Sequence, residues 1–115
     1  MSRIHLTWTG CGAFEVRTDL VNFAFDPYKF SDDLESAEPE FDFIFISHEH
    51  FDHCHPKTLQ RLCQGDRIKR VLVSPGCCNP NQPVNEKYGD AAFERDLPIT
   101  KHINPRLVEV AFPKY

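Results

Sequence analysis

The sequence predicts a mixed α+β or α/β fold, in which an antiparallel meander is followed by a strand–loop–helix–strand unit. Apolar and polar residues alternate over much of residues 3–26, which is typical of short strands with one buried face. Residues 41–46 are nearly all apolar, β-branched or aromatic, as in a strand that is buried on both faces. Pro56 suits the first turn of a helix, and the apolar run inside residues 70–74 predicts the next strand. This order predicts that the second part of the sheet is parallel.

Three strands are expected within the meander. The first alternates apolar with polar side chains, so we expect it to be half-buried through Ile4, Leu6 and Trp8, with His5 at the surface. Residues 10–12 contain two glycines and predict a turn. The second strand follows at about residues 14–17, and the third covers residues 21–26 and ends at Pro27.

The rest of the chain combines regular elements with polar or proline-rich stretches. Residues 28–40 are rich in Ser, Asp, Glu and Pro and predict a polar loop. The helix after Pro56 should end at Gly65. Residues 75–88 contain three prolines and are expected to be irregular. Residues 91–97 suit one or two helical turns, and residues 107–112 predict a last strand.

Length and composition favour one small intracellular domain. The 115 residues suffice for a single domain, 1–115, and 41% of them are hydrophobic. No run approaches the roughly 20 apolar residues of a membrane span, and the N-terminus lacks the apolar region of a signal peptide. The net charge of −4 argues against a nucleic-acid partner. Five cysteines without a Cys-x-x-Cys pair indicate reduced thiols, which places the protein in the cytoplasm.

Residues 47–56 carry the chemistry that the sequence offers most clearly. They contain the pattern His-x-His-x-Asp-His, formed by His48, His50, Asp52 and His53, directly after a predicted buried strand. Histidine is the commonest metal ligand among side chains, and carboxylate oxygen completes many zinc sites. Loops at the carboxyl ends of parallel strands are the usual place for active sites in open α/β sheets. We therefore predict a metal site formed by these four residues.

The spacing of these residues favours two metal ions over one. If the loop continues the strand in an extended form, His48 and His50 point to one side, whereas Asp52 and His53 point elsewhere. The alternative is a polar loop without a metal. Three imidazoles and a carboxylate would be costly to hold together without a cation.

Several neighbouring residues admit two interpretations. His55 follows the pattern at once and adds a fourth imidazole. Cys54 could supply a thiolate, although a small packing residue is the favoured interpretation. The vicinal Cys77 and Cys78 could bind a soft metal, but two thiols in a turn is the favoured interpretation. Asp26 either caps local amides in a turn or reaches the metal loop from a neighbouring strand end.

The pattern at residues 48–53 resembles the signature of the metallo-β-lactamase fold superfamily. The lead-in, from Trp8 to Pro27, is similar to the opening of the lactonase-like and phosphodiesterase-like hydrolases of that superfamily. The resemblance covers about residues 4–74. It implies that the chain is the N-terminal half of an αββα sandwich, and that Asp26 supports the metal loop by fixing the orientation of ligand histidines.

The same resemblance implies a hydrolytic reaction. Two divalent ions about 3.5–4 Å apart can share a water and lower its pKa towards ~7. The resulting hydroxide can attack an ester, lactone, thioester, amide or phosphodiester of a small-molecule substrate. Asp52 is the predicted catalytic residue, because it can both bind an ion and hydrogen-bond that hydroxide. Zinc is the predicted metal, with manganese and iron as alternatives.

The chain departs from the family pattern after residue 55. Family members complete the site with two later histidines and a bridging aspartate, but only His102 follows here, and Asp90 and Asp96 match poorly. We therefore expect an incomplete site, and a homodimer or pairing with a second half-domain. A nuclease of the same superfamily and a non-catalytic metal-binding or assembly module are the alternative functions.

Overall fold

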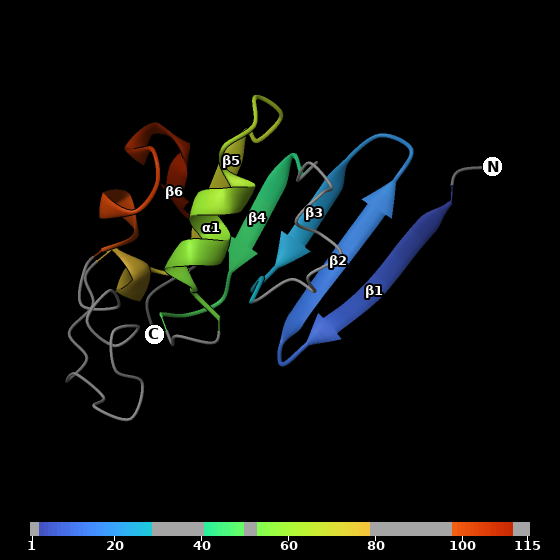
Figure 1. Ribbon diagram of the computed structural model, residues 1–115, viewed down its shortest axis with the longest axis horizontal. Coiled ribbons are helices and arrows are strands. Elements are labelled where there is room, and N and C mark those ends of the chain that lie inside the picture. Colours follow the sequence, from blue (N-terminus) through green and yellow to red (C-terminus); the bar gives the residue numbers. More distant parts are fainter. Residues whose placement is uncertain (1–2, 29–40, 50–52, 79–97, 112–115) are drawn as a thin grey trace.

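A mixed six-stranded sheet forms the framework of the molecule (Figure 1). The computed structural model describes residues 3–28, 41–49, 53–78 and 98–111, and all structural statements below concern these residues. The strands lie side by side in chain order: β1 (Ile4–Gly10), β2 (Ala13–Thr18), β3 (Asn22–Phe25), β4 (Phe43–Ile46), β5 (Arg70–Val73) and β6 (Val108–Val110). Helix α1 (Pro56–Leu62) connects β4 with β5, and short 3-10 helices are η2 (Pro75–Cys77), η4 (Ile99–Lys101) and η5 (Pro105–Leu107).

The pairing of the strands confirms the predicted order of an antiparallel and a parallel part. β1, β2 and β3 are antiparallel neighbours, whereas β3, β4, β5 and β6 run parallel to one another. The carboxyl ends of the parallel strands and of β1 therefore meet at one edge of the sheet, the lower edge in Figure 1. The last strand is shorter than predicted, because Leu107 belongs to η5, which begins after the Asn104 cap. Predictions for residues 29–40, 79–97 and 112 lie outside the described residues.

The core lies between the sheet and α1. Alternate residues of β4 and β5 point to this side and are fully buried: Ile44, Ile46, Val71 and Val73. They pack against Leu59 and Leu62 of α1 and against Ile99 and Ile103 near η4. Figure 1 shows α1 lying across β4 and β5. Burial of this face holds the end of β4 against α1.

The opposite face of the sheet is more exposed at β1 than the sequence predicts. β1 was expected to be half-buried, but Ile4, Leu6 and Trp8 are 73%, 66% and 64% exposed. The register places them on the same face as Phe14 of β2 and Phe25 of β3, each 38% exposed. The prediction was wrong because alternation shows that a strand has an apolar face, whereas burial of that face requires a second layer. No such layer covers β1 among the residues described.

Asp42 ties the amino ends of three strands together. It lies just before β4 and is 5% exposed. Its Oδ2 accepts a hydrogen bond from the backbone N–H of Asn22 at 2.8 Å, and the guanidinium of Arg67 donates to both carboxylate oxygens at 3.2 Å. Its own backbone bonds to Asn22 and Lys69. The Asn22 amide, followed by Arg67, lowers the pKa of Asp42 below its ordinary value of 3.8.

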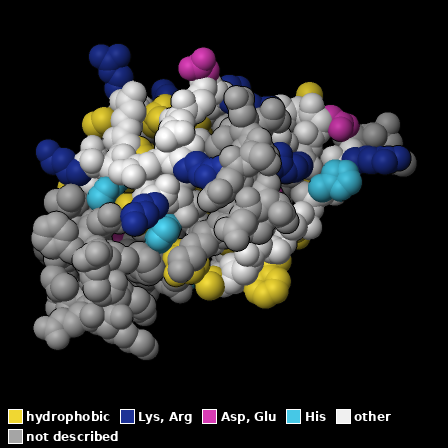
Figure 2. Space-filling model, viewed as in Figure 1, with side chains coloured by type: hydrophobic (Ala, Val, Ile, Leu, Met, Phe, Trp, Pro, Cys, Tyr) yellow, Lys and Arg dark blue, Asp and Glu magenta, His cyan; other side chains and the backbone are white. Residues whose placement is uncertain are grey.

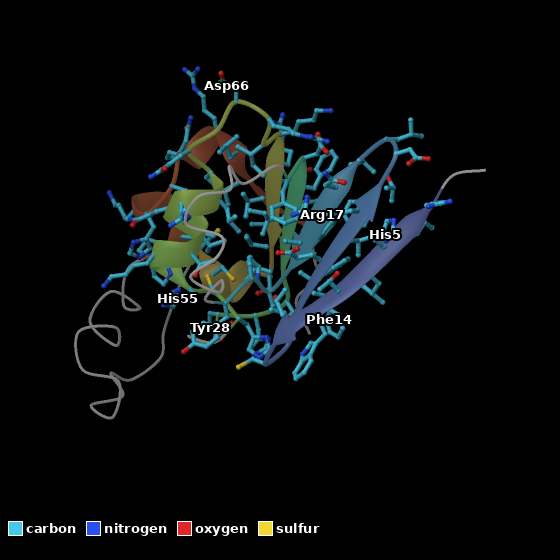
Figure 3. The ribbon with its side chains drawn as sticks, turned by 45° about the vertical axis from the view of Figure 1, so that its right-hand side comes forward. His5, Phe14, Arg17, Tyr28, His55 and Asp66 are labelled. Carbon is cyan, nitrogen blue, oxygen red and sulfur yellow. The ribbon has the colours of Figure 1, made fainter. Side chains whose placement is uncertain are left out.

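We expect Asp42→Asn to lower the free energy of unfolding by about 1–3 kcal/mol, because it removes a charged acceptor from a buried set of hydrogen bonds. The folded-state pKa of Asp42 lies below the unfolded one, so its contribution is fully present above about pH 4 and is lost as the pH falls through the folded-state pKa. Urea unfolding at neutral and acid pH measures this difference. The exposed Asp66, in the loop after α1 (Figure 3), gives the control Asp66→Asn. Equal stability of wild type and Asp42→Asn at both pH values would contradict the assignment.

Candidate metal centre

Asp26 stands at the point where β3 ends against β4. Its backbone N–H donates to the carbonyl of Phe45 at 2.8 Å, which continues the parallel pairing by one residue. Its φ of 44° lies in the left-handed region, which aspartate tolerates better than most residues, and Pro27 follows. The side chain is thereby turned towards the loop that leaves β4, and the residue is only 7% exposed.

The carboxylate of Asp26 organises the start of that loop. Its Oδ1 accepts a hydrogen bond from the backbone N–H of Ser47 at 2.6 Å, and its Oδ2 accepts one from the Ser47 hydroxyl at 2.5 Å. The Oδ2 atom also lies 2.8 Å from Nδ1 of His53. One carboxylate therefore fixes both ends of the segment that carries the predicted metal ligands.

His48 and His53 lie side by side at this edge. Their ring centroids are 4.0 Å apart with the rings tilted by 39°, and ligand atoms of Asp26, His48 and His53 all lie within 4.8 Å of one another. Two imidazoles this close would repel each other if both were protonated, whereas neutral imidazoles beside a carboxylate suit a divalent cation. The donor set therefore fits the metal that the sequence predicts.

Gly12 provides the space in which the His53 ring sits. A Cβ atom at Gly12 would lie 2.7 Å from Cε1 and 3.2 Å from Nδ1 of His53. Such distances are closer than ordinary van der Waals contact. The β1–β2 turn therefore forms one wall of the candidate site, and this wall needs a residue without a side chain.

We expect Gly12→Ala to displace the His53 ring and to weaken zinc binding by about 10–100-fold, the range typical when the orientation of a metal-binding histidine is lost. Zinc titration in competition with a chromophoric chelator measures the change. Cys11→Ala, in the same turn but with an exposed side chain, is the matched control. If Gly12→Ala binds zinc with the wild-type affinity, the position of the His53 ring does not matter for zinc binding.

A family model described as a beta-lactamase superfamily domain matches residues 5–108. The chain belongs to the β-lactamase superfamily. Superfamily membership confirms the resemblance inferred from the His-x-His-x-Asp-His pattern, and the sheet with α1 confirms the predicted partial fold of this superfamily. No curated protein matches the chain.

A crystal structure from Parabacteroides distasonis supports the superfamily fold. It is described as a candidate metal-dependent hydrolase, and it is similar to this chain with a TM-score of 0.55 and 24% sequence identity. The similarity covers 65% of this chain and 33% of that one. The matched part of this chain thus spans about a third of the length of that protein.

The superfamily pattern is only partly visible in the described residues. His50 and Asp52 lie outside them, so their roles as ligands and the catalytic role of Asp52 stay predictions. The structure brings His48 next to His53, and it places Asp26 in contact with His53. Three hydrogen bonds occupy most of the acceptor positions of the Asp26 carboxylate, which favours an orienting role over direct metal binding.

Three other histidines lie outside this group of ligand atoms. His55 is the N-cap of α1: its Nδ1 accepts from the backbone N–H of Thr58 at 3.3 Å and lies 2.7 Å from the Thr58 hydroxyl. The ring of Tyr28 packs edge-on against the His55 ring, with the ring centroids 5.0 Å apart. Both residues are labelled in Figure 3. His102 caps η4, and His5 is exposed on β1. The group of ligand atoms within 4.8 Å includes none of these three.

The cysteines near the loop belong to the packing of the core. Cys54 and Cys78 pack against the core cluster, and Cys77 is part of it. The Cys54 thiol donates a hydrogen bond to Cys77, which raises the pKa of Cys54 and lowers the pKa of Cys77. Burial raises the pKa of Cys63 to about 12. All five cysteines are free thiols, and these contacts agree with the interpretation of Cys54 as a packing residue.

Two contacts at this edge were missed by sequence reasoning. The sequence identifies Ser47 only as a loop residue, although it bonds to Asp26 through its backbone and its side chain. Gly76 lies against Glu49, and a Cβ there would come within 2.6 Å of the Glu49 carboxyl carbon. Both depend on neighbouring strand ends meeting in space, and a single strand-end pattern gives no signal of that.

Proposed function

We propose that this chain is part of a metal-dependent hydrolase, which uses a metal-activated water to cleave an ester, lactone or phosphodiester bond of a small-molecule substrate. The observation that carries the proposal is the group formed by Asp26, His48 and His53, whose ligand atoms lie within 4.8 Å of one another where parallel strands end. Membership of the β-lactamase superfamily and the described activity of the Parabacteroides distasonis relative support it.

Each residue has a defined part in this proposal. His48 and His53 would hold the metal through their ring nitrogens, with His50 and Asp52 as the further ligands expected from the sequence. Asp26 keeps the His53 ring in place through its 2.8 Å contact. Asp52 also hydrogen-bonds the attacking water. Zinc, with manganese or iron as alternatives, would supply the chemistry at this site: a pair of ions in the complete site would lower the pKa of a bound water and polarise the substrate.

The charge distribution favours small substrates over nucleic acid. The chain carries a net charge of −4. On the side of the molecule that Figure 2 shows, the basic side chains of the described residues are scattered rather than gathered into one patch. Nucleic-acid binding depends on clustered Lys and Arg, so a nuclease is the weaker alternative.

The apolar face of the sheet bears on how the enzyme is completed. It exposes Ile4, Leu6, Trp8, Phe14 and Phe25, and Phe25 stacks on Phe45 at 5.0 Å. We propose that residues 1–115 form one incomplete domain, and that this face is covered by a second copy of the chain or by a second half-domain. Such a large apolar patch typically marks an interaction surface.

The cellular location is also part of the proposal. Within the described ranges, no helix has the length and apolar character needed to cross a membrane. The five free thiols suit a reducing compartment, so we propose the cytoplasm.

Two assays on the purified chain test the function. Zinc stoichiometry comes first, because two ions support a hydrolytic site, whereas one or none favours a non-catalytic module. Hydrolysis of an aryl ester, a lactone, a bis-aryl phosphate and RNA is then compared between zinc-loaded and chelated protein. We expect slow, zinc-dependent turnover of one of the small substrates. Turnover of RNA alone would favour a nuclease, and zinc binding without any zinc-dependent turnover would favour the module.

A further inference from the structure

Ser47 connects Asp26 with His48. Its backbone N–H donates to Oδ1 of Asp26 at 2.6 Å, its Oγ lies 2.5 Å from Oδ2 of the same carboxylate, and the same Oγ lies 2.8 Å from Nδ1 of His48. The Asp26 carboxylate also contacts Nδ1 of His53. A single acidic group is thus linked to both imidazoles, directly to one and through a hydroxyl to the other.

The number of protons in these contacts determines the direction of each hydrogen bond. An ionised carboxylate only accepts, so the single hydroxyl proton of Ser47 is donated to Asp26. The Ser47 oxygen can then only accept from His48, which requires the proton of that ring to be on Nδ1. The same reasoning places a proton on Nδ1 of His53. In the neutral form of each ring, Nε2 then carries the lone pair.

We infer that Ser47 is a positioning residue, which passes the influence of Asp26 to His48 so that one carboxylate sets the tautomers of both histidines. The inference rests on the proposed function in that it assigns Nε2 as the metal-binding atom of both rings. A neutral imidazole with its Nδ1–H held by an oxygen acceptor is the arrangement that orients a histidine ligand and increases its basicity. Ser47 therefore prepares His48 for metal before any metal binds.

The backbone of the same residue allows a clean test. The hydrogen bond from the Ser47 N–H to Oδ1 of Asp26 does not involve the side chain. Ser47→Ala therefore keeps the loop tied to β3 and removes only the hydroxyl link, whereas Ser47→Thr retains a hydroxyl. Ser74 is a matched control, because it follows β5 as Ser47 follows β4, and its hydroxyl contacts Cys77 at 3.5 Å rather than a histidine.

The experiment measures zinc affinity and the histidine tautomers of the metal-free chain. Ser47→Ala is expected to weaken zinc binding by about 10–100-fold, with Ser47→Thr and Ser74→Ala close to wild type. Long-range proton–nitrogen NMR of the metal-free wild type should show His48 protonated at Nδ1, and Ser47→Ala should shift His48, but not His53, towards a mixture of tautomers.

The two readouts separate this inference from the proposed function. A wild-type His48 protonated at Nε2, or a Ser47→Ala variant with unchanged tautomers and zinc affinity, would overturn the role of Ser47. A wild-type chain that binds no zinc would instead refute the metal site, while the tautomer spectrum of the metal-free protein would still decide the role of Ser47.

Discussion

Replacing His48 and His53 together by alanine is expected to reduce zinc affinity by more than about 100-fold, because loss of ligands should exceed the 10–100-fold effect of losing their supporting contacts. These two rings lie 4.0 Å apart and supply two of the three ligand atoms that the structure brings together. Competition with a chromophoric chelator measures the loss.

The control removes the same number of imidazoles elsewhere. This control is the double variant His5→Ala with His55→Asn. His5 is exposed on β1, and asparagine at position 55 can still cap the N-terminus of α1. This double variant should bind zinc as the wild type does. A parallel variant, His48→Ala with His50→Ala, tests the pairing predicted from the sequence. Full zinc content in the His48→Ala/His53→Ala protein would contradict the metal assignment.

Self-association of the isolated chain is the second large effect that we expect. With about 200 Å² for a large apolar side chain, the exposed fractions of Ile4, Leu6, Trp8, Phe14 and Phe25 correspond to roughly 550 Å² of one face. Two such faces packed together would bury roughly 1,100 Å², which is just above the roughly 1,000 Å² that a biological interface needs. The charged pair Arg70 and Glu109 lies at the β5–β6 end and would fall at the rim.

Sedimentation velocity over a range of concentrations tests this expectation. The wild type should sediment as a dimer or larger species, and a double change, Leu6→Lys with Trp8→Lys, should give a monomer at the same concentrations. Leu20→Lys is the matched control, since Leu20 is 91% exposed in the turn between β2 and β3 rather than on this face. A wild type that is monomeric throughout, with family-like zinc-dependent turnover, would refute both the interface and the incomplete site.

Much of the fold could be predicted because each element has a local signal. The apolar run before Ser47, the proline at position 56 and the spacing of Leu59 and Leu62 identify β4 and α1 without any long-range information. The exposure of β1 could not be predicted, because it depends on what lies against its apolar face. The same holds for Asp42, which interrupts an apolar run in the sequence and whose carboxylate accepts hydrogen bonds from Asn22 and Arg67 in other segments.

The residues of the candidate site also divide into those that could be predicted from the sequence and those that could not. The His-x-His-x-Asp-His pattern could be recognised because its members are neighbours in the chain. The contact between Asp26 and His53 links β3 with the end of the loop, and resemblance to known proteins supplied that expectation. The role of Gly12 as a wall for His53 had no signal beyond a turn-forming residue. His55 shows the converse, because it stands beside the predicted ligands in the sequence, whereas its side chain caps α1.

X-ray absorption at the zinc edge of the zinc-loaded chain tests the metal site most directly. We expect nitrogen and oxygen neighbours at about 2.0–2.2 Å, with the multiple scattering of at least two imidazole rings, and we expect this imidazole signal to be lost in His48→Ala/His53→Ala. A sulfur shell at about 2.3 Å would place the metal on cysteines such as Cys54 and Cys77. That result, or a spectrum without imidazole scattering, would contradict the proposed metal centre.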